Sequence, residues 1–471
     1  MDNEGDSLLE YFKEAIIFFK QVQWLYNMPV TKILLNGALN LFPIDWLKTL
    51  NNLENNELNS LVVRTEIQSD WPASLIDFVT SCKKLNKLPG PCKSISPVKL
   101  PDAFLKKLSI KKQHEIFHLA HLVHKQCSSQ NLSCIVDLGS GLGYISQLLN
   151  HVYGYQVLGL ESNAQNVQTA KIRQNALFPE SLSSVKYVCS NVTRDSAKSI
   201  ELLLQQQFGE TGNICLIGLH ACGDLSVYMS QVFQEMKKAQ LLVLISCCYH
   251  KLTLSHTHKD CNSSEESEYF EYFPLSETFI KAINITETDV GKFFRRPFLR
   301  LACQETSDRW KTMSLEAHQE HSFHVLARAI LELYSAENEL ILKKLVRKAT
   351  RKSQCSKFDI YLQDCTQRYS YVKQIGDQEI GIPWDEKMRS AIMALWNINA
   401  KQQKNVELYT ALQLILQNAA ESLVLYDRLC FLKEHGCKTS MHSTMDRSLS
   451  PRCYALVSTK NLNDVQISTK T

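Results

Sequence analysis

Residues 135–143 read Ile-Val-Asp-Leu-Gly-Ser-Gly-Leu-Gly, a short apolar run followed by a turn that holds three glycines. The apolar residues are typical of a buried parallel strand. Beyond the glycines, apolar side chains recur at helical spacing at Ile145, Leu148, Leu149 and Val152. A strand, a glycine turn and a helix form the first unit of a doubly wound nucleotide-binding sheet. The stretch therefore predicts a ligand that lies against bare backbone at this turn.

The spacing of the glycines distinguishes between nucleotide cofactors. In the dinucleotide fingerprint Gly-x-Gly-x-x-Gly the third glycine would fall on Tyr144, which disfavours a dinucleotide oxidoreductase. The chain instead has Asp-x-Gly-x-Gly-x-Gly, with Ser140 between Gly139 and Gly141. This pattern resembles motif I of the class I S-adenosylmethionine-dependent methyltransferases. That cofactor has a cationic sulfonium and an ammonium, so a carboxylate such as Asp137 is favourable beside the turn.

Composition sets limits on the class of protein. A chain of 471 residues, 44% hydrophobic and 21% charged, is ordinary globular material for two or three domains, or for one domain with large additions. The net charge of +4 is too small to identify a partner. The sixteen cysteines show no tight disulfide framework, and residues 1–6 show no signal-peptide pattern. We therefore expect reduced thiols and an intracellular protein, cytoplasmic or nuclear, without a membrane span.

Strands and helices alternate from about residue 134 to residue 250. Short apolar runs end at polar or glycine-rich segments, and each is followed by a helical pattern. Such alternation predicts a mostly parallel sheet with helices on its faces. After the run at 134–138, the predicted strands are Gln156–Leu160, Val185–Cys189, Asn213–Leu219 and Leu241–Ser246.

The end of the chain supplies the rest of the predicted sheet. A long helix over about 405–435 precedes two short strand candidates, 437–443 and 453–459. Class I methyltransferases add a helix and an antiparallel hairpin after the fifth strand. The sequence thus predicts an α/β, Rossmann-like, seven-stranded sheet, with a helical insertion before its last two strands. The alternative is a small independent helical domain in place of the insertion. The predicted parts are a helical N-terminal region (1–110), the first part of the core (111–309), the insertion (310–400) and the closing helix and hairpin (401–471).

Two polar segments stand apart from this pattern. Residues 253–272 are polar and acidic, and we expect a mobile loop there. Residues 343–352 form a basic run. This run is either a solvated helix face or a stripe that contacts phosphates.

The residues that end the strands are the candidates for the cofactor site, because ligands of such sheets lie at the carboxyl ends of the strands. Asp137 and the glycine turn are expected to face the methionine end of S-adenosylmethionine. Glu161 can accept both ribose hydroxyls, or it is only a solvated helix cap. Asn191 is placed to bond the adenine edge. The predicted cofactor-binding residues are Asp137, Gly139, Ser140, Gly141, Gly143, Glu161 and Asn191.

The next two strand ends are the candidates for the acceptor side. His220 and Asp224 are the predicted catalytic residues, since methyl transfer needs a base when the nucleophile carries a proton. The alternative is a core histidine and a helix cap. A zinc site would combine Cys222, Cys247 or Cys248, and His250, but adjacent cysteines seldom share one tetrahedral ion and no Cys-x-x-Cys pair exists. The sequence therefore predicts no metal, and the substrate-facing residues are Cys222, Cys247, Cys248, Tyr249 and His250.

Four motifs together resemble the methyltransferase-like protein 25 family. They are Lys-Lys-Gln-His-Glu-Ile (111–116), Asp-Leu-Gly-Ser-Gly-Leu-Gly (137–143), Gly-Leu-His-Ala-Cys-Gly-Asp-Leu-Ser (218–226) and Cys-Cys-Tyr-His-Lys-Leu (247–252). A more distant likeness is to transfer RNA 2′-O-methyltransferases, from which Asp224 and Tyr249 depart in position and type. The resemblance implies a methyltransferase of an unidentified macromolecule, with RNA ahead of protein. A non-catalytic module that keeps the fold, and perhaps the cofactor, is the alternative class.

Overall fold

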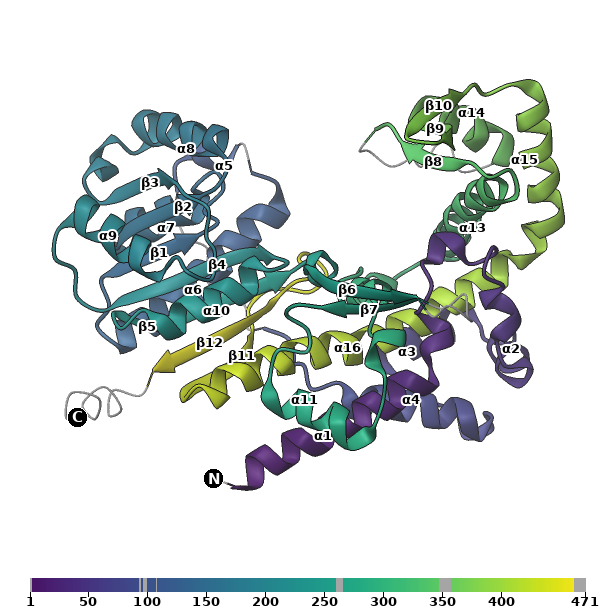
Figure 1. Ribbon diagram of the computed structural model, residues 1–471, viewed down its shortest axis with the longest axis horizontal. Coiled ribbons are helices and arrows are strands. Elements are labelled where there is room, and N and C mark those ends of the chain that lie inside the picture. The colour runs from purple at the N-terminus through teal and green to yellow at the C-terminus, as the bar shows by residue number, and fades with distance from the viewer. Residues whose placement is uncertain are drawn as a thin grey trace. The chain divides into compact units, whose positions relative to one another are not determined.

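The computed structural model describes residues 2–92, 95, 100–106, 108–259, 266–346 and 357–460 (Figure 1). The chain divides into two compact units, each built from segments that are far apart in the sequence. The first unit comprises Met1–Ile17, Leu85–Thr306 and Ala420–Thr471, and the second comprises Phe18–Lys84 and Ser307–Ala419.

The first unit is built on a seven-stranded sheet in the order β11-β12-β5-β4-β1-β2-β3. The five strands β1 to β5 run parallel to one another. Every residue of β1 and β5 is buried, as expected for strands covered on both faces. The strands are β1 (Cys134–Leu138), β2 (Gln156–Glu161), β3 (Val185–Cys189), β4 (Ile214–Cys222), β5 (Ala239–Cys247), β11 (Cys437–Ser443) and β12 (Tyr454–Lys460).

Helices cover both faces of this sheet (Figure 1). On one face, Val136 and Leu138 of β1 share a core with residues of α9, α10 and the last turns of α16. Asp137 points to the opposite face, where Ser146 of α7 donates a hydrogen bond to it. The helices are α6 (Ile110–Ser129), α7 (Tyr144–Tyr153), α8 (Ala164–Leu177), α9 (Ala197–Phe208), α10 (Leu225–Glu235) and α16 (Gln403–Glu434).

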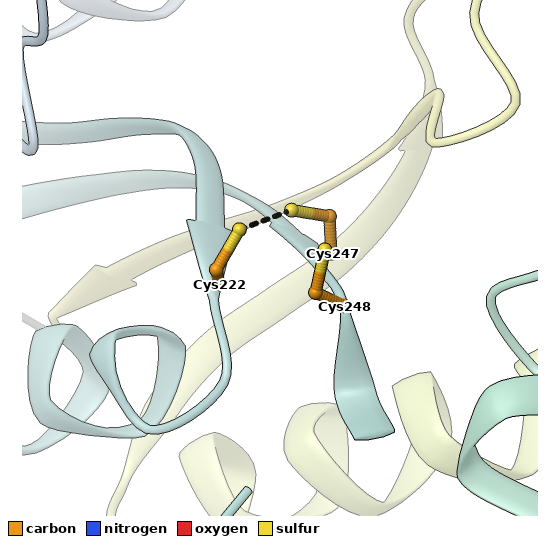
Figure 2. A group of neighbouring side chains, drawn as sticks. All are labelled: Cys222, Cys247 and Cys248. Carbon is orange, nitrogen blue, oxygen red and sulfur yellow. Dashed lines mark hydrogen bonds between the residues drawn. The ribbon is translucent and has the colours of Figure 1, made fainter. Parts of the chain in front are cut away.

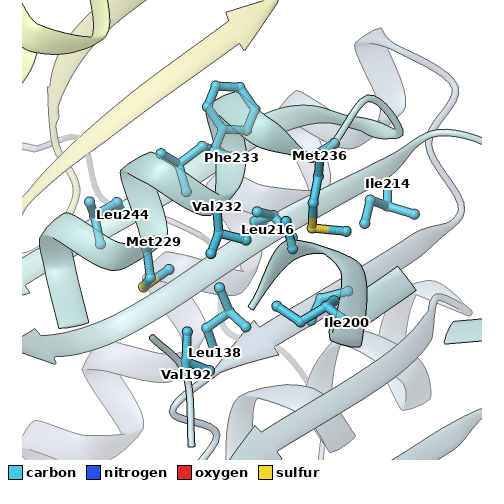
Figure 3. Packing of buried hydrophobic residues seen from close by; sticks show 14 of the residues in the cluster. Leu138, Val192, Ile200, Ile214, Leu216, Met229, Val232, Phe233, Met236 and Leu244 are labelled. Carbon is cyan, nitrogen blue, oxygen red and sulfur yellow. The ribbon is translucent and has the colours of Figure 1, made fainter. Parts of the chain in front are cut away.

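The core under α9 and α10 holds the carboxyl ends of the strands in place. Figure 3 shows Met229 and Val232 of α10 beside Leu244 and Leu216 of the neighbouring strands, and Phe233 of the same helix belongs to the same core. All five of these side chains are fully buried. Burying each large apolar side chain contributes roughly 1.5–3 kcal/mol, so this layer stabilises the packing of α10 on the sheet.

The C-terminal hairpin completes the sheet, as the sequence predicts. β12 pairs antiparallel with β5, with Leu456 opposite Leu244, and β11 pairs antiparallel with β12. The expected α/β class I methyltransferase fold is confirmed by this strand order. The hairpin closes a sheet whose first five strands end at Cys247, 190 residues before β11 begins at Cys437.

Removal of the hairpin is expected to make the chain aggregate. A truncation after residue 400 deletes α16, β11 and β12, so β5, whose residues are all buried, becomes an unpaired apolar edge. Size-exclusion chromatography should place this variant in the void volume, whereas deletion of residues 461–471 alone should leave a monodisperse protein. A monodisperse 1–400 fragment would contradict the role of the hairpin.

The segment expected to be a mobile loop at 253–272 is largely a hairpin. β6 (Leu254–Lys259) pairs antiparallel with β7 (Glu266–Phe270), and residues 260–265 lie outside the described part. The expectation failed because Tyr269 stacks on His256 and closes against Gly291. Gly291 lies outside this segment, so the composition of residues 253–272 does not reveal that Tyr269 has a packing partner there.

The N-terminus of α11 (Glu277–Thr286) is anchored on the last turns of α16. Asp427 accepts hydrogen bonds from the backbone N–H groups of Leu275 and Ser276, and Glu434 accepts them from Glu277 and Thr278. Carboxylates at a helix N-terminus satisfy its orphan amides. The helices in this part are α1 (Asp2–Gln21, shared with the second unit), α5 (Asp102–Leu105), α11 (Glu277–Thr286) and α12 (Arg296–Leu301).

The second unit is helical but contains a small sheet that the sequence analysis did not predict. Three antiparallel strands in the order β10-β9-β8 interrupt the predicted helical insertion. Phe323, Tyr361 and Tyr371 belong to its own hydrophobic core. The elements are α2 (Ile44–Asn51), α3 (Asn55–Arg64), α4 (Ala73–Leu85), α13 (Leu315–Glu337), β8 (Ile341–Lys344), α14 (Phe358–Arg368), β9 (Tyr369–Ile375), β10 (Gln378–Ile382) and α15 (Glu386–Asn399).

The basic run 343–352 is therefore not a helix face where it is described. Lys343 and Lys344 end strand β8, and Lys343 forms an ion pair with Glu379. The helix was expected because Lys, Leu and Arg are strong helix formers, but pairing with β9 overrides that local preference. Residues 347–352 lie outside the described part of the chain. The division into core, insertion and closing segment stays a prediction.

Candidate active site

A cavity of about 370 Å³ opens at the carboxyl ends of β1 to β4 in the first unit. Its size is within the range of pockets for small ligands, roughly 300–1,000 Å³. Among the predicted site residues, Gly139, Asn191, Cys222 and Asp224 line it. The other lining residues, which the sequence analysis missed, are Leu160, Ser162, Ser190, Val192, Gly223, Leu225, Tyr228 and Lys251.

The glycine turn is held by hydrogen bonds to the neighbouring strand. The N–H groups of Gly139 and Ser140 both donate to the carbonyl of Leu160, at 2.8 and 2.9 Å. Gly139 has a φ of +78°, and a Cβ there would lie 3.2 Å from the Leu225 side chain. Gly139 is thus a position where a left-handed backbone and a close approach both require glycine.

Glu161 braces this turn. One carboxylate oxygen accepts the N–H of Gly141 at 2.9 Å, and the other accepts the N–H of Asn163 at 2.9 Å. The oxygen that accepts from Asn163 also accepts from the Asn166 side chain at 3.5 Å, so the oxygen that accepts from Gly141 is the one that retains a lone pair for a further hydrogen bond. Glu161 is not among the residues that line the cavity.

Three predicted cofactor residues lie behind the turn and do not line the cavity. Asp137 is 1% exposed, and burial raises its pKa to about 6 despite the hydrogen bond from Ser146. Ser140 is also buried. Gly143 makes room for Tyr187, because a Cβ at Gly143 would lie 2.4 Å from the Tyr187 hydroxyl oxygen. None of these three residues lines the cavity, and their direct contact with the cofactor stays a prediction.

His220 is held by a buried carboxylate that the sequence analysis did not select. Its Nε2 lies 2.9 Å from Oε2 of Glu115, and Ser450 donates to the other oxygen of Glu115 at 2.9 Å. Glu115 is 2% exposed, and His220 has a left-handed φ of +62°. When the neutral imidazole of His220 donates its Nε2–H to this carboxylate, the free lone pair of the ring is on Nδ1. The signal for Glu115 was its place in the motif at 111–116.

The ionised form of Glu115 is strongly favoured in the folded chain. Burial alone would raise the pKa of Glu115, but the hydrogen bond and charge of His220, together with Lys112 and Ser450, lower it to about 2. A depressed carboxyl pKa contributes stability above the unfolded pKa, and that stability is lost as the pH falls through the folded value.

Glu115→Gln is accordingly expected to destabilise the protein in a pH-dependent way. Above pH 5 the variant should lose free energy of unfolding on the order of 3 kcal/mol. The difference from wild type should shrink between about pH 4.5 and about pH 2. Denaturant titrations of both proteins at stepped pH measure it, and a constant difference across that window would contradict the ionic role.

Asp224 ties together the loops that follow β4 and β5. Its two carboxylate oxygens accept the N–H of Thr253 at 3.0 Å and the hydroxyl of Thr253 at 2.5 Å. The loops come so close that a Cβ at Gly223 would lie 2.8 Å from the carbonyl oxygen of Lys251. Asp224 lines the cavity, so it both braces this wall and faces its interior.

Three cysteine thiols meet at the same strand ends (Figure 2). Sγ of Cys222 lies 3.0 Å from Sγ of Cys247, and Sγ of Cys248 lies within 4.8 Å of both. The hydrogen bond from Cys247 lowers the pKa of Cys222 to about 6, and the same partnership raises the pKa of Cys247. Cys222 is therefore the most acidic of the three thiols.

The next two residues of the loop turn away from the cavity. Tyr249 is 1% exposed, and its hydroxyl donates to Glu421 of α16 at 3.3 Å. His250 is half-buried, with Nδ1 3.1 Å from Sγ of Cys303. The prediction that Tyr249 faces the substrate is wrong, because the buried Glu421–Arg452 pair offers its hydroxyl a partner in the core. His250 does not line the cavity.

Comparison with protein families agrees with this geometry. Residues 111–255 match the family model described as a methyltransferase domain. The match spans the four parallel strands that border the cavity and the loops that carry the candidate residues. It supports S-adenosylmethionine as the cofactor, as the glycine turn predicts.

Two curated relatives share the resemblance seen in the motifs. The chain is 22% identical over 310 residues to the probable methyltransferase-like protein 25 of Mus musculus, covering 64% of this chain and 47% of the relative. It is 23% identical over 251 residues to the protein of the same name from Homo sapiens, covering 52% and 36%. The chain thus spans about half, or less, of the length of these relatives.

Solved structures of methyltransferases also align with the chain. A SAM-dependent methyltransferase from Aquifex aeolicus aligns with 17% identity and a TM-score of 0.21, covering 32% of this chain and 74% of that one. TrmK of M. capricolum, solved with S-adenosyl-homocysteine, aligns with 14% identity and a TM-score of 0.21, covering 34% and 65%.

Among the described helices, none combines the length and the apolar character that crossing a bilayer requires.

Proposed function

We propose that this chain is an S-adenosylmethionine-dependent methyltransferase that modifies a macromolecule. The observation that supports it most is the cavity lined by Gly139 and Asn191 at the carboxyl ends of parallel strands. A bound S-adenosylmethionine supplies an electrophilic methyl group. The cavity fits such a ligand, because Gly139 exposes bare backbone and Ser162, Ser190 and Asn191 present polar groups at the ends of β2 and β3.

The chain's own residues would bind the cofactor on one side and orient the acceptor on the other. Methyl transfer needs the nucleophile aligned with the methyl group, so the walls formed by Asp224, Tyr228 and Lys251 are the positioning surface. His220, with its tautomer set by Glu115, is our candidate base for a nucleophile that carries a proton.

We favour RNA over protein as the acceptor. The run 343–352 holds six basic residues, among them Lys343 and Lys344 at the end of β8. Closely spaced cations favour a phosphate backbone. A protein acceptor is the first alternative, and a non-catalytic binding module is the second.

Transfer of a labelled methyl group into extract from cells that lack the protein tests these functions. Purified protein and tritiated S-adenosylmethionine are added, and the product is digested with nuclease or with protease. Label that nuclease destroys supports an RNA acceptor, whereas label that only protease destroys assigns a protein acceptor. The absence of label, despite cofactor binding measured by calorimetry, would support the non-catalytic module.

Charge reversal of the basic run tests the RNA acceptor directly. Arg347→Glu, Lys348→Glu, Arg351→Glu and Lys352→Glu together should raise KM for RNA, and the rate should fall steeply with salt. Reversal of exposed lysines such as Lys171 and Lys198 in the first unit is the matched control. A salt-insensitive reaction that the four reversals leave unchanged would exclude this role of the run.

We also propose that the protein works in the cytoplasm or the nucleus. The fourteen cysteines that the structure describes are all free thiols, although Cys222 and Cys247 are almost in contact. Free thiols persist in reducing compartments. Fractionation of cells with an antibody against the native protein distinguishes these compartments from the secretory pathway.

A further inference from the structure

The cysteine cluster at the ends of β4 and β5 has the composition of a metal site. Figure 2 shows Cys222 reaching from β4 toward Cys247 and Cys248 at the end of β5. All three Sγ atoms lie within 4.8 Å of one another. Across the described part of the chain, no other group of three His, Cys, Asp or Glu side chains meets this criterion.

The backbone is bent in a way that brings these sulfurs together. Cys222 is opposite Cys247 in the parallel pairing, after a register shift between Leu219 and Ala221. Cys248 has a left-handed φ of +50°, and His220, inside the register shift, has +62°. A left-handed non-glycine residue costs on the order of 1–3 kcal/mol. Adjacent residues of a regular strand point to opposite faces, so the turn at Cys248 is what returns its thiol to the side of Cys247.

We propose that Cys222, Cys247 and Cys248 bind one Zn²⁺ ion as three thiolates, with its fourth position directed toward the cavity. A Zn–S bond is about 2.3 Å, so the sulfurs of a tetrahedral site lie about 3.8 Å apart. Cys222 and Cys247, 3.0 Å apart, reach this spacing when their sulfurs separate by less than about 1 Å, and Cys248 lies within 4.8 Å of both. Three protein ligands with one open position are typical of zinc sites that bind a water or a substrate.

The surroundings match such an ion better than a disulfide. A bond between Cys222 and Cys247 would use two sulfurs and leave the strained third, Cys248, without a role. Cys222 lines the cavity beside Lys251, so the open position would face the same space as Gly139 and Asn191. The Lys251 cation lines the same cavity as Cys222 and would balance part of the negative charge of a three-thiolate zinc site. His250 does not join the three sulfurs as a fourth ligand, because its ring nitrogens do not lie within 4.8 Å of all of them.

This inference replaces the sequence-based expectation of no metal. That expectation rested on the rarity of adjacent cysteines around one ion, which presumes a regular backbone between them. It is also independent of the proposed methyl transfer, because zinc content is measured without any substrate.

Metal analysis of the full chain, expressed with zinc in the medium and purified anaerobically without chelator, tests the proposal. Mass spectrometry should give about one zinc per chain. Cys222→Ser and Cys248→Ser should each lower zinc retention against a competing chelator at least tenfold. Cys303→Ser, at a half-buried thiol beside the cluster, is the matched control and should retain the ion.

The wild-type protein supplies a second readout that does not depend on the folding of variants. After exchange of zinc for Co²⁺, the intensity of the thiolate-to-cobalt charge-transfer absorption should correspond to three thiolates. Zinc at the background level in reduced wild-type protein would overturn the proposal, as would a Cys222–Cys247 disulfide in that preparation. Loss of methyl transfer with zinc retained would count against the proposed function alone.

Discussion

Gly139→Arg is expected to abolish binding of S-adenosylmethionine. Gly139 lines the cavity, and even a Cβ there would lie 3.2 Å from the Leu225 side chain. An arginine would fill the space beside the turn and bring a cation toward a cationic ligand. Isothermal calorimetry should show micromolar binding by wild type and no heat from the variant, a loss of at least 100-fold, or about 2.7 kcal/mol.

The control for this prediction separates loss of the ligand from backbone strain. Gly154 has a φ of +76°, close to that of Gly139, but a Cβ there meets nothing within 4 Å and it does not line the cavity. Gly154→Arg should therefore lower the melting temperature by a similar amount and bind the cofactor as wild type does. Equal binding by Gly139→Arg and wild type would refute the cofactor site.

His220→Ala is expected to reduce turnover by roughly 10²–10⁴ and to leave cofactor affinity within a few-fold. The reason is that a positioned base acts on the acceptor, while His220 does not line the cavity that would hold the cofactor. The rate of label transfer into the acceptor fraction, divided by the concentration of folded protein, measures the effect. Glu115→Gln should give a smaller loss, with a shifted pH profile, because Glu115 acts through His220.

A purely structural role for His220 gives a different result. The variant would then melt at a lower temperature, and its remaining folded protein would keep full activity. His435→Ala, at an exposed histidine beyond the end of α16, controls for the loss of an imidazole in general. Turnover of His220→Ala equal to that of the control would eliminate His220 as the base.

Much of the sheet can be predicted from the sequence because its signals are local. Each of these signals is contained in a few consecutive residues: the apolar runs before Asp137 and Glu161, and the helical spacing after Gly143. The predicted strand 156–160 differs from β2 by one residue, and the predicted strands 437–443 and 453–459 differ from β11 and β12 by at most one. By contrast, the sequence did not predict β8, because its residues favour a helix and only the pairing with β9 makes them a strand.

The sequence by itself therefore determined the class of fold and the edge of the sheet that carries the candidate site, because periodicity, glycine spacing and strand ends are properties of short segments. Only the tertiary structure decided which of the conspicuous residues meet. Glu115 holds His220 across 105 positions of chain, and Cys222 meets Cys247 across 25. Tyr249, predicted to face the substrate, is a core residue because α16 brings Glu421 to its hydroxyl. Burial and hydrogen bonding between distant segments control these outcomes, and no local pattern encodes them.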